Sequence, residues 1–267
     1  MPELRFPRRA PSSAPAPRTD ETPRPPAARS DVISCRATNP LSIHDDVSKV
    51  FIDERQAKAT TATRLFRNEE LFSALRDKAM PSYFRQSALS RRPFVIWSSG
   101  CSSGEEVYSL AMVALGEFAG KGTAPNLDAF GTDINRERLA LARAGCYGMP
   151  SRQAIGEAYW ALLLRHARLE GASVRMGDDL RARCRFGVFD MRQRPKKHTF
   201  DFIVCNHVLQ YYDPPGQLHI LRNLQEVLKP GGHLYLEGIT DGARSAMKLQ
   251  KIEGQPNLFV PAPLHPH

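Results

Sequence analysis

The feature that most constrains the fold is a short apolar segment that runs through a loop of small residues straight into a helix. Phe94-Val95-Ile96-Trp97 is β-branched and aromatic, which is typical of a buried parallel strand. Residues 98–104 are all glycine, serine or cysteine, and apolar residues at helical spacing follow from Glu105. In open parallel sheets, ligands bind beyond the carboxyl ends of the strands. We therefore expect a ligand site at this loop.

Strand-like and helix-like segments alternate after residue 93, which predicts a doubly wound α/β sheet with helices on both faces. The pattern predicts further strands at 127–132, 185–189, 200–205 and 233–237, and helices at 105–118, 136–144 and 218–228. Residues 148–179 do not follow the alternation: we expect a helix at 155–168, then polar turns, as a small inserted subdomain. Lys229-Pro230-Gly231-Gly232 predicts a turn that ends a helix, and 257–260 a last antiparallel strand.

The first forty residues differ sharply from the rest. Residues 1–40 are rich in proline and arginine and poor in large apolar side chains, so they cannot bury enough surface to offset their chain entropy. We expect a disordered arm, which either has no specific function or docks through its basic charge. Residues 41–92 then predict a short helical region, 93–260 the main domain and 261–267 a tail.

Charge and apolar content limit the class of protein. The net charge of +9 favours an acidic partner, such as nucleic acid, a membrane surface or a glutamate-rich protein. No apolar run is long enough to cross a bilayer and the first residues do not form a secretory signal, so we expect a cytoplasmic protein without membrane insertion. The five cysteines are scattered, which predicts reduced thiols and no metal site.

The small-residue loop favours a cationic ligand. It departs from the G-x-G-x-x-G pattern, and Glu105 and Glu106 occupy the helix start, where a pyrophosphate would need positive charge. S-adenosylmethionine carries an ammonium and a sulfonium group and no phosphate, so it suits an acidic first turn. The alternative is that both glutamates only complement the helix dipole.

An acidic residue at the end of the next strand points to the same ligand. Asp133 could accept hydrogen bonds from both ribose hydroxyls of an adenosine group. Alternatively, Asp133 or Asn135 caps the helix that begins at Arg136. Taken in order, the loop, the acidic strand end, the strand at 200–205 and the Lys-Pro-Gly-Gly turn match the nucleoside-methyltransferase variant of the doubly wound fold.

Longer motifs make the resemblance specific. They are Thr60-Thr61-Ala62-Thr63-Arg64-Leu65-Phe66-Arg67, Ile96-Trp97-Ser98-Ser99-Gly100-Cys101-Ser102-Ser103-Gly104-Glu105-Glu106, Gly131-Thr132-Asp133-Ile134, and residues 200–213. Over about residues 60–260 the chain resembles the chemotaxis receptor methyltransferases, which are S-adenosylmethionine-dependent protein-glutamate O-methyltransferases. The resemblance implies a protein substrate, the cytoplasmic helices of chemoreceptors, and we expect the enzyme to act as a monomer.

The resemblance also implies a set of site residues. The cofactor would be bound by Thr61, Thr63, Arg67, Gly100, Glu106 and Asp133, and its adenosine lined by Asp190, Met191, Asn206 and His207. Arg67 and Tyr211 would face the transferred methyl group as the catalytic pair. Outside the resemblance, Arg67 reads as a surface charge, Tyr211 as a core aromatic residue and His207 as a general base.

The chain departs from the family pattern at several of these positions. Thr61 replaces an asparagine, Asp190-Met191 an Asn-Leu pair and Asn206-His207 an Arg-Asn pair, and Thr240-Asp241 stands where the family has Ser-Glu. The helical N-terminal region is short as well. These departures leave two alternatives: a methyltransferase for a small molecule or another protein, or a catalytically silent binding module. A nucleic-acid enzyme is disfavoured because the chain lacks an Asn-Pro-Pro-Tyr motif.

Overall fold

The computed structural model describes residues 63–87, 92–195 and 199–262. Outside these ranges lie the predicted arm at 1–40, the first part of the predicted helical region at 41–92, and Thr61. Within them, no helix is long and apolar enough to cross a membrane.

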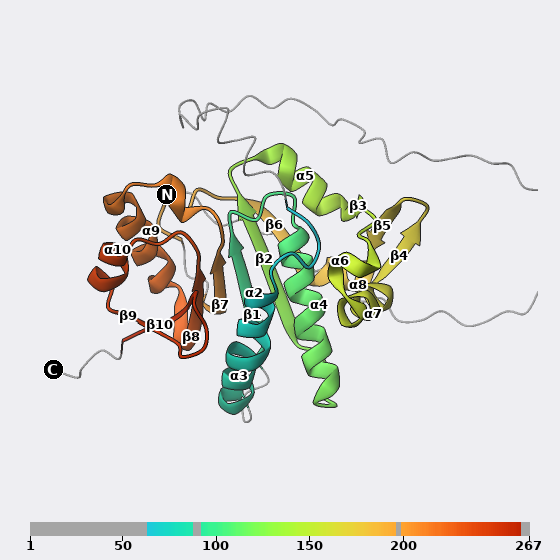
Figure 1. Ribbon diagram of the computed structural model, residues 1–267, viewed down its shortest axis with the longest axis horizontal. Coiled ribbons are helices and arrows are strands. Elements are labelled where there is room, and N and C mark those ends of the chain that lie inside the picture. The colour runs from blue at the N-terminus through green and yellow to red at the C-terminus, as the bar shows by residue number, and fades with distance from the viewer. Residues whose placement is uncertain (1–62, 88–91, 196–198, 263–267) are drawn as a thin grey trace, which may run out of the picture.

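A seven-stranded sheet forms the centre of the fold, in the order β6-β2-β1-β7-β8-β10-β9 (Figure 1). Its strands are β1 (Phe94–Ser99), β2 (Leu127–Asp133), β6 (Cys184–Val188), β7 (Phe200–Cys205), β8 (Leu228–Leu236), β9 (Leu249–Lys251) and β10 (Leu258–Pro261). The first five in spatial order run parallel, and β10 is antiparallel to β8 and β9. The predicted doubly wound α/β class is confirmed, and the strand order reverses at β1.

Two apolar layers cover the two faces of this sheet. On one face, strand residues such as Ile96 pack with α4 (Glu105–Gly120), α5 (Arg136–Ala144), η1 (Leu75–Ala79) and α3 (Met80–Ser87). On the other face, Trp97 and its neighbours pack with α9 (Pro214–Glu226) and α10 (Asp241–Ala246). Because successive strand residues point to opposite faces, Ile96 and Trp97 belong to different layers. This arrangement leaves the carboxyl ends of the strands free for a site.

The segment before β1 enters through α2 (Glu69–Ala74), as the sequence predicts. Asn68 caps this helix by accepting a hydrogen bond from Leu71 N at 3.1 Å. One π-helical element, η1, separates α2 from α3, and Leu71, Phe72 and Leu75 are buried. The residues just before α2 are thereby fixed against the body of the domain.

An inserted subdomain lies between α5 and α8 (Asp178–Arg183), a helix that the sequence pattern did not predict. It contains α6 (Arg152–Ile155), α7 (Glu157–His166) and a three-stranded sheet of order β3-β5-β4. These strands are β3 (Cys146–Gly148), β4 (Ala167–Glu170) and β5 (Ser173–Met176). The helix predicted at 155–168 is wrong at both ends, because Gly156 has φ 80° and ψ 161° and Ala167 is extended. The predicted polar turns are in part the strands β4 and β5.

The C-terminal part of the sheet also differs from the prediction in detail. The helix α9 ends at Glu226, and β8 already begins at Leu228, so Lys229-Pro230-Gly231-Gly232 lies inside a strand. The register between β7 and β8 shifts in this stretch, and Gly231 has φ 73°. The sequence pattern predicts a turn at Pro230-Gly231-Gly232, but these residues form an irregular part of strand β8. The predicted antiparallel strand near 257–260 is confirmed as β10.

One buried carboxylate joins three strands at the opposite end of the sheet from the loop. Asp201 at the start of β7 pairs with Arg92 at 2.5 Å and with Lys229 at 2.8 Å, and it accepts a hydrogen bond from Val95 N at 2.9 Å. Its side chain is 7% exposed. Loss of one partner from a buried pair leaves the other charges uncompensated.

We expect Asp201→Ala to lower the free energy of unfolding by about 3 kcal/mol, because Arg92 and Lys229 would lose their counter-charge in a partly buried place. Urea unfolding followed by circular dichroism measures this change. Asp178→Ala, which removes an exposed carboxylate paired with Arg181, serves as the control and should change stability little. Equal stability of the two variants would contradict this account of β7.

Candidate active site

The loop between β1 and α4 folds back tightly against the end of β2. Gly100 N and Cys101 N both donate to Thr132 O, at 2.8 and 2.9 Å. Gly100 has φ 82°, and a Cβ atom there would lie 2.5 Å from Val208 Cγ2. Only glycine therefore fits this position without movement. The loop lies where the strand order reverses, as expected for a ligand site in this fold.

Glu106 in the first turn of α4 carries a half-buried carboxylate. It accepts hydrogen bonds from Ser98 Oγ at 2.8 Å and from Asn206 Nδ2 at 3.0 Å. Burial raises its pKa, which the hydrogen bonds from Asn206 and Ser98 oppose. The negative charge of Glu237 raises the pKa further, and Arg67 lowers it. Glu106 thus lies among groups from four separate segments, which the sequence pattern alone did not bring together.

Glu105 has a different task from its neighbour. Its carboxylate accepts a hydrogen bond from Ser103 Oγ at 2.8 Å and is hydrogen-bonded to Thr63. Burial also raises the pKa of Glu105. Glu105 therefore holds the loop and the segment before α2 together, while Glu106 contacts the ends of β1 and β7.

Asp133 at the end of β2 is bound to the same loop. Its Oδ2 accepts from Ser102 N at 2.8 Å and its Oδ1 from Asn135 N at 2.9 Å. The cap of α5 is Asn135, whose side chain accepts from Arg138 N at 3.0 Å. The N-cap alternative therefore applies to Asn135, and each Asp133 oxygen keeps acceptor capacity for a ligand.

Asp190 and Met191 follow β6 and border the same end of the sheet. Phe189 N donates to Asp133 O at 3.2 Å, which brings Asp190 near the β2 end. Burial alone would raise the pKa of Asp190, but hydrogen bonds and ion pairing from Arg192 outweigh it and lower the pKa. Met191 is buried beside Gly100, with its Cε 3.5 Å from the position of a Cβ there. Met191 thus lies beside the loop and Asp190 near the end of β2, and their contact with an adenosine stays a prediction.

Asn206 and His207 follow β7 on the opposite side of the loop. Asn206 Nδ2 donates to Glu106, and its buried Oδ1 has no hydrogen-bond partner among the residues that the structure describes. His207 has φ 57°, which is unusual for a residue other than glycine. Its Nδ1 lies 3.1 Å from Glu237 Oε2. A backbone in a disfavoured conformation is typical of a functional site.

The two residues predicted to face the methyl group differ in how firmly they are held. Arg67 is exposed, its charge acts on Glu106, and it stands between the buried Phe66 and the helix cap Asn68. Tyr211 is 38% exposed, and its hydroxyl accepts a hydrogen bond from Gln210 Nε2 at 2.9 Å. Tyr211 is therefore a surface residue and not part of the core.

A match to a protein-family model decides between the families of this fold. Residues 61–255 match the model described as "CheR methyltransferase, SAM binding domain". The chain belongs to the CheR methyltransferase family. The resemblance read from the motifs is thus confirmed, and with it the assignment to S-adenosylmethionine-dependent methyltransferases.

Curated relatives of this CheR chain carry names from chemotaxis. A probable chemotaxis protein methyltransferase of Rhizobium etli is 32% identical over 184 residues, which cover 66% of this chain and 66% of the relative. Chemotaxis protein methyltransferase 1 of Vibrio cholerae is 32% identical over 197 residues, with 69% and 68% covered. A 104.1 kDa protein of Rhodobacter capsulatus matches over only 19% of its own length. The chain thus spans about two thirds of these chemotaxis relatives.

The CheR site fits S-adenosylmethionine on two counts. The unpartnered Asn206 Oδ1 and the Glu106 carboxylate offer two adjacent acceptors, which an ammonium group can satisfy. Asp133 keeps acceptor capacity for ribose hydroxyls, and the absence of a side chain at Gly100 lets Val208 pack closely against the loop. The donor and acceptor set is therefore that of a cationic nucleoside.

Sequence reasoning missed Glu237 as a member of this CheR site. Its Oε1 accepts from Asn68 Nδ2 at 2.9 Å and from Tyr235 OH at 3.0 Å, and its Oε2 faces His207. It therefore joins the segment after Arg67, the end of β8 and the residue after Asn206. The sequence signal for Glu237 is its position directly after the apolar end of β8, because Asp133 lies at the same end of β2 and parallel strands end at one edge of the sheet.

We expect the affinity for S-adenosylmethionine to fall as the pH is lowered through the raised pKa of Glu106. Protonation removes the charge that attracts the ammonium group, and it occurs above the ordinary glutamate value of about 4.3. Glu106→Gln should weaken binding at neutral pH by roughly tenfold or more and flatten this part of the profile. Calorimetric titrations over a pH series measure both effects.

Glu105→Gln is the matched control, since the pKa of Glu105 is also raised but its carboxylate is bonded to Ser103. It should keep the pH dependence of binding. A flat profile for Glu105→Gln, or unchanged affinity in Glu106→Gln, would refute the assignment of the ammonium group to Glu106.

Proposed function

We propose that this chain transfers a methyl group from S-adenosylmethionine to glutamate side chains of chemoreceptor-type proteins, as a monomer in the cytoplasm. The observation that carries the proposal is the half-buried Glu106 carboxylate with Asn206 beside it, in a domain of the CheR family. The names of the chemotaxis relatives support the acceptor class. The net charge of +9 suits a glutamate-rich protein, because opposite charge steers association. In this proposal residues 93–260 form the catalytic domain.

The cofactor would be held by residues at the ends of four strands, β1, β2, β6 and β7. Glu106 and Asn206 Oδ1 bind the ammonium group, and Asp133 binds the ribose hydroxyls. Gly100, Met191, Asp190 and His207 border the adenosine. When bound, S-adenosylmethionine supplies a methyl group on a positively charged sulfur. Thr63 contributes through Glu105, which keeps the loop in place.

The acceptor needs alignment and no general base. A glutamate carboxylate with a reference pKa near 4.3 is already ionised at neutral pH. One of its oxygens forms a bond to the methyl carbon while the methyl–sulfur bond breaks and the sulfur keeps the electron pair. The anion and the cation neutralise each other, so exclusion of water favours the transfer. Alignment at about 3 Å is worth roughly 7 to 11 kcal/mol of the barrier.

Two side chains at the open side of the site align this acceptor. Arg67 holds the carboxylate by its charge, and its lowering effect on the pKa of Glu106 supports a position near the cofactor. Tyr211 at the rim orients the acceptor through its hydroxyl. His207 is engaged by Glu237, which fits a role in shaping the pocket and not in removing a proton.

Mass spectrometry of chemoreceptor cytoplasmic fragments, incubated with the purified chain and S-adenosylmethionine, tests the proposal. We expect added methyl groups on glutamates that are lost on mild base treatment, since methyl esters hydrolyse. Labelled cofactor added to cell extract separates the alternatives: label on small molecules or on base-stable sites would overturn the glutamate assignment. Cofactor binding without turnover on any acceptor would indicate a silent module.

We expect Tyr211→Phe to slow methyl transfer by about tenfold, roughly 1.4 kcal/mol of transition-state stabilisation, because only the orienting hydroxyl is lost. Binding of S-adenosylhomocysteine should change little, as the residue lies at the rim. Single-turnover rates and calorimetry measure the two quantities. Tyr212→Phe on the neighbouring residue is the control, and an equal loss of rate in both variants would contradict a specific role for Tyr211.

A further inference from the structure

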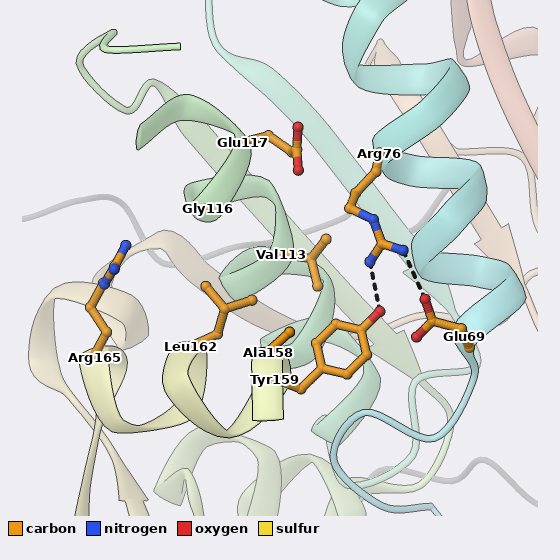
Figure 2. A pocket seen from close by; sticks show the side chains of 9 residues that line it. All are labelled: Glu69, Arg76, Val113, Gly116, Glu117, Ala158, Tyr159, Leu162 and Arg165. Carbon is orange, nitrogen blue, oxygen red and sulfur yellow. Dashed lines mark hydrogen bonds and ion pairs between the residues drawn. The ribbon is translucent and has the colours of Figure 1, made fainter. Parts of the chain in front are cut away.

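A groove outlined by η1, α4 and α7 lies where the inserted subdomain meets the body of the domain (Figure 2). None of its lining residues belongs to the proposed cofactor site. Tyr159 of α7 lines this groove, and its hydroxyl points toward Arg76 of η1, whose Nη1 donates to it at 2.6 Å. Arg76 also pairs with Glu69 at 2.8 Å. The inserted subdomain is thus in polar contact with η1, which follows Arg67 and α2 in the chain.

The ring of Tyr159 also stacks on an aromatic residue that does not line the groove. It stacks on the ring of Phe66, with centroids 4.8 Å apart and planes inclined by 18°. Phe72 of α2 meets the Tyr159 ring edge-on at 5.4 Å and the Phe66 ring at 6.0 Å. Aromatic pairs in these geometries attract beyond simple burial. An aromatic cluster of three rings therefore joins α7, α2 and the residue before Arg67.

Phe66 is the residue through which this cluster reaches the site. It has φ 53°, a left-handed conformation that is costly for an aromatic residue, and its side chain is 6% exposed. Its N–H donates to Ser109 Oγ at 2.9 Å, and Ser109 Oγ donates to Glu105 O at 2.7 Å. A disfavoured backbone conformation persists only where its surroundings hold it. The next residue along the chain is Arg67, whose charge acts on Glu106.

We propose that Tyr159 is a positioning residue for methyl transfer: by stacking on Phe66, the inserted subdomain keeps Arg67 aligned with the acceptor. Tyr159 acts through Phe66 and touches neither cofactor nor acceptor. The inference rests on the proposed role of Arg67. The inferred path runs from α7 of the inserted subdomain through Phe66 to Arg67. Displacement of α7 would therefore lower the rate of methyl transfer without preventing cofactor binding.

The test compares a variant that removes the ring with one that keeps it. Tyr159→Leu should lower kcat on the receptor fragment about tenfold, while the Kd for S-adenosylhomocysteine stays within about threefold of the parent, because Glu106, Asp133 and Asn206 are untouched. Tyr159→Phe loses the bond to Arg76 but keeps the stack, so its kcat should stay within about twofold. If Tyr159→Phe falls as far as Tyr159→Leu, the stacking account is wrong.

Trp160→Leu on the same helix is the matched control, since Trp160 is a half-buried aromatic residue of α7 that is not one of the three rings of the aromatic cluster. It should lower the melting temperature without a selective loss of kcat. Equal loss of kcat in Trp160→Leu and Tyr159→Leu would show a general loss of packing and overturn the proposal. Should Tyr159→Leu not fold, Tyr159→His and Tyr159→Met give the same comparison of ring and no ring.

Hydrogen exchange gives a readout that does not depend on turnover. Amides of residues 64–68 should exchange several-fold faster in Tyr159→Leu than in the parent and in Trp160→Leu, because the local structure opens more often. Unchanged exchange there would refute the inference whatever the activity. Failure of the parent chain to methylate the receptor fragment would instead refute the proposed function, and the exchange data would still decide whether Tyr159 holds the segment that contains Arg67.

Discussion

A half-buried carboxylate at the start of α4, that of Glu106, is the constraint on which the rest of the site depends. Taking Glu106 out of water is costly unless its oxygens are bonded, and Ser98 and Asn206 provide those bonds from two neighbouring strands. The strand order β2-β1-β7 places those donors on either side of the helix start. The parallel sheet, the small-residue loop and the acidic helix start are therefore parts of a single electrostatic arrangement. A cationic ligand completes it, because positive charge compensates what burial makes unfavourable.

The central sheet could be predicted from local pattern because its strands are short, apolar and separated by strong helix signals. The strands around 94–97, 127–132 and 200–205 and the helix at 136–144 lie where the sequence places them. The errors fall where local signals are ambiguous. Gly156 breaks a segment that otherwise resembles one helix, and Pro230 with two glycines suggests a turn although pairing with β7 keeps the segment in the sheet. Tertiary pairing outweighs local preference there.

The motifs predicted which residues lie at this edge of the sheet better than they predicted the hydrogen bonds between them. The loop, Glu106, Asp133, Asp190, Met191 and the pair after β7 all lie at the same edge of the sheet, as the parallel topology requires. The different tasks of Glu105 and Glu106, and of Asp133 and Asn135, depend on hydrogen bonds that only the folded chain forms. Glu237 and Tyr159 escaped the sequence analysis because each has a partner more than 90 residues away in the chain, Asn68 for Glu237 and Phe66 for Tyr159. No local periodicity encodes such pairings.

The insertion between α5 and α8 leaves and rejoins the domain at nearly the same point. Met176 N donates to Gly145 O at 2.8 Å, so one hydrogen bond closes the base of a loop of some thirty residues. Because this base is closed, the length of the insertion can change without a change in the register of the main sheet. In evolution such a module can be lengthened, shortened or exchanged while the strands that hold the cofactor stay in place. The family could in this way acquire new recognition surfaces without rebuilding the sheet that holds the cofactor, provided that the contact of α7 with Phe66 is kept.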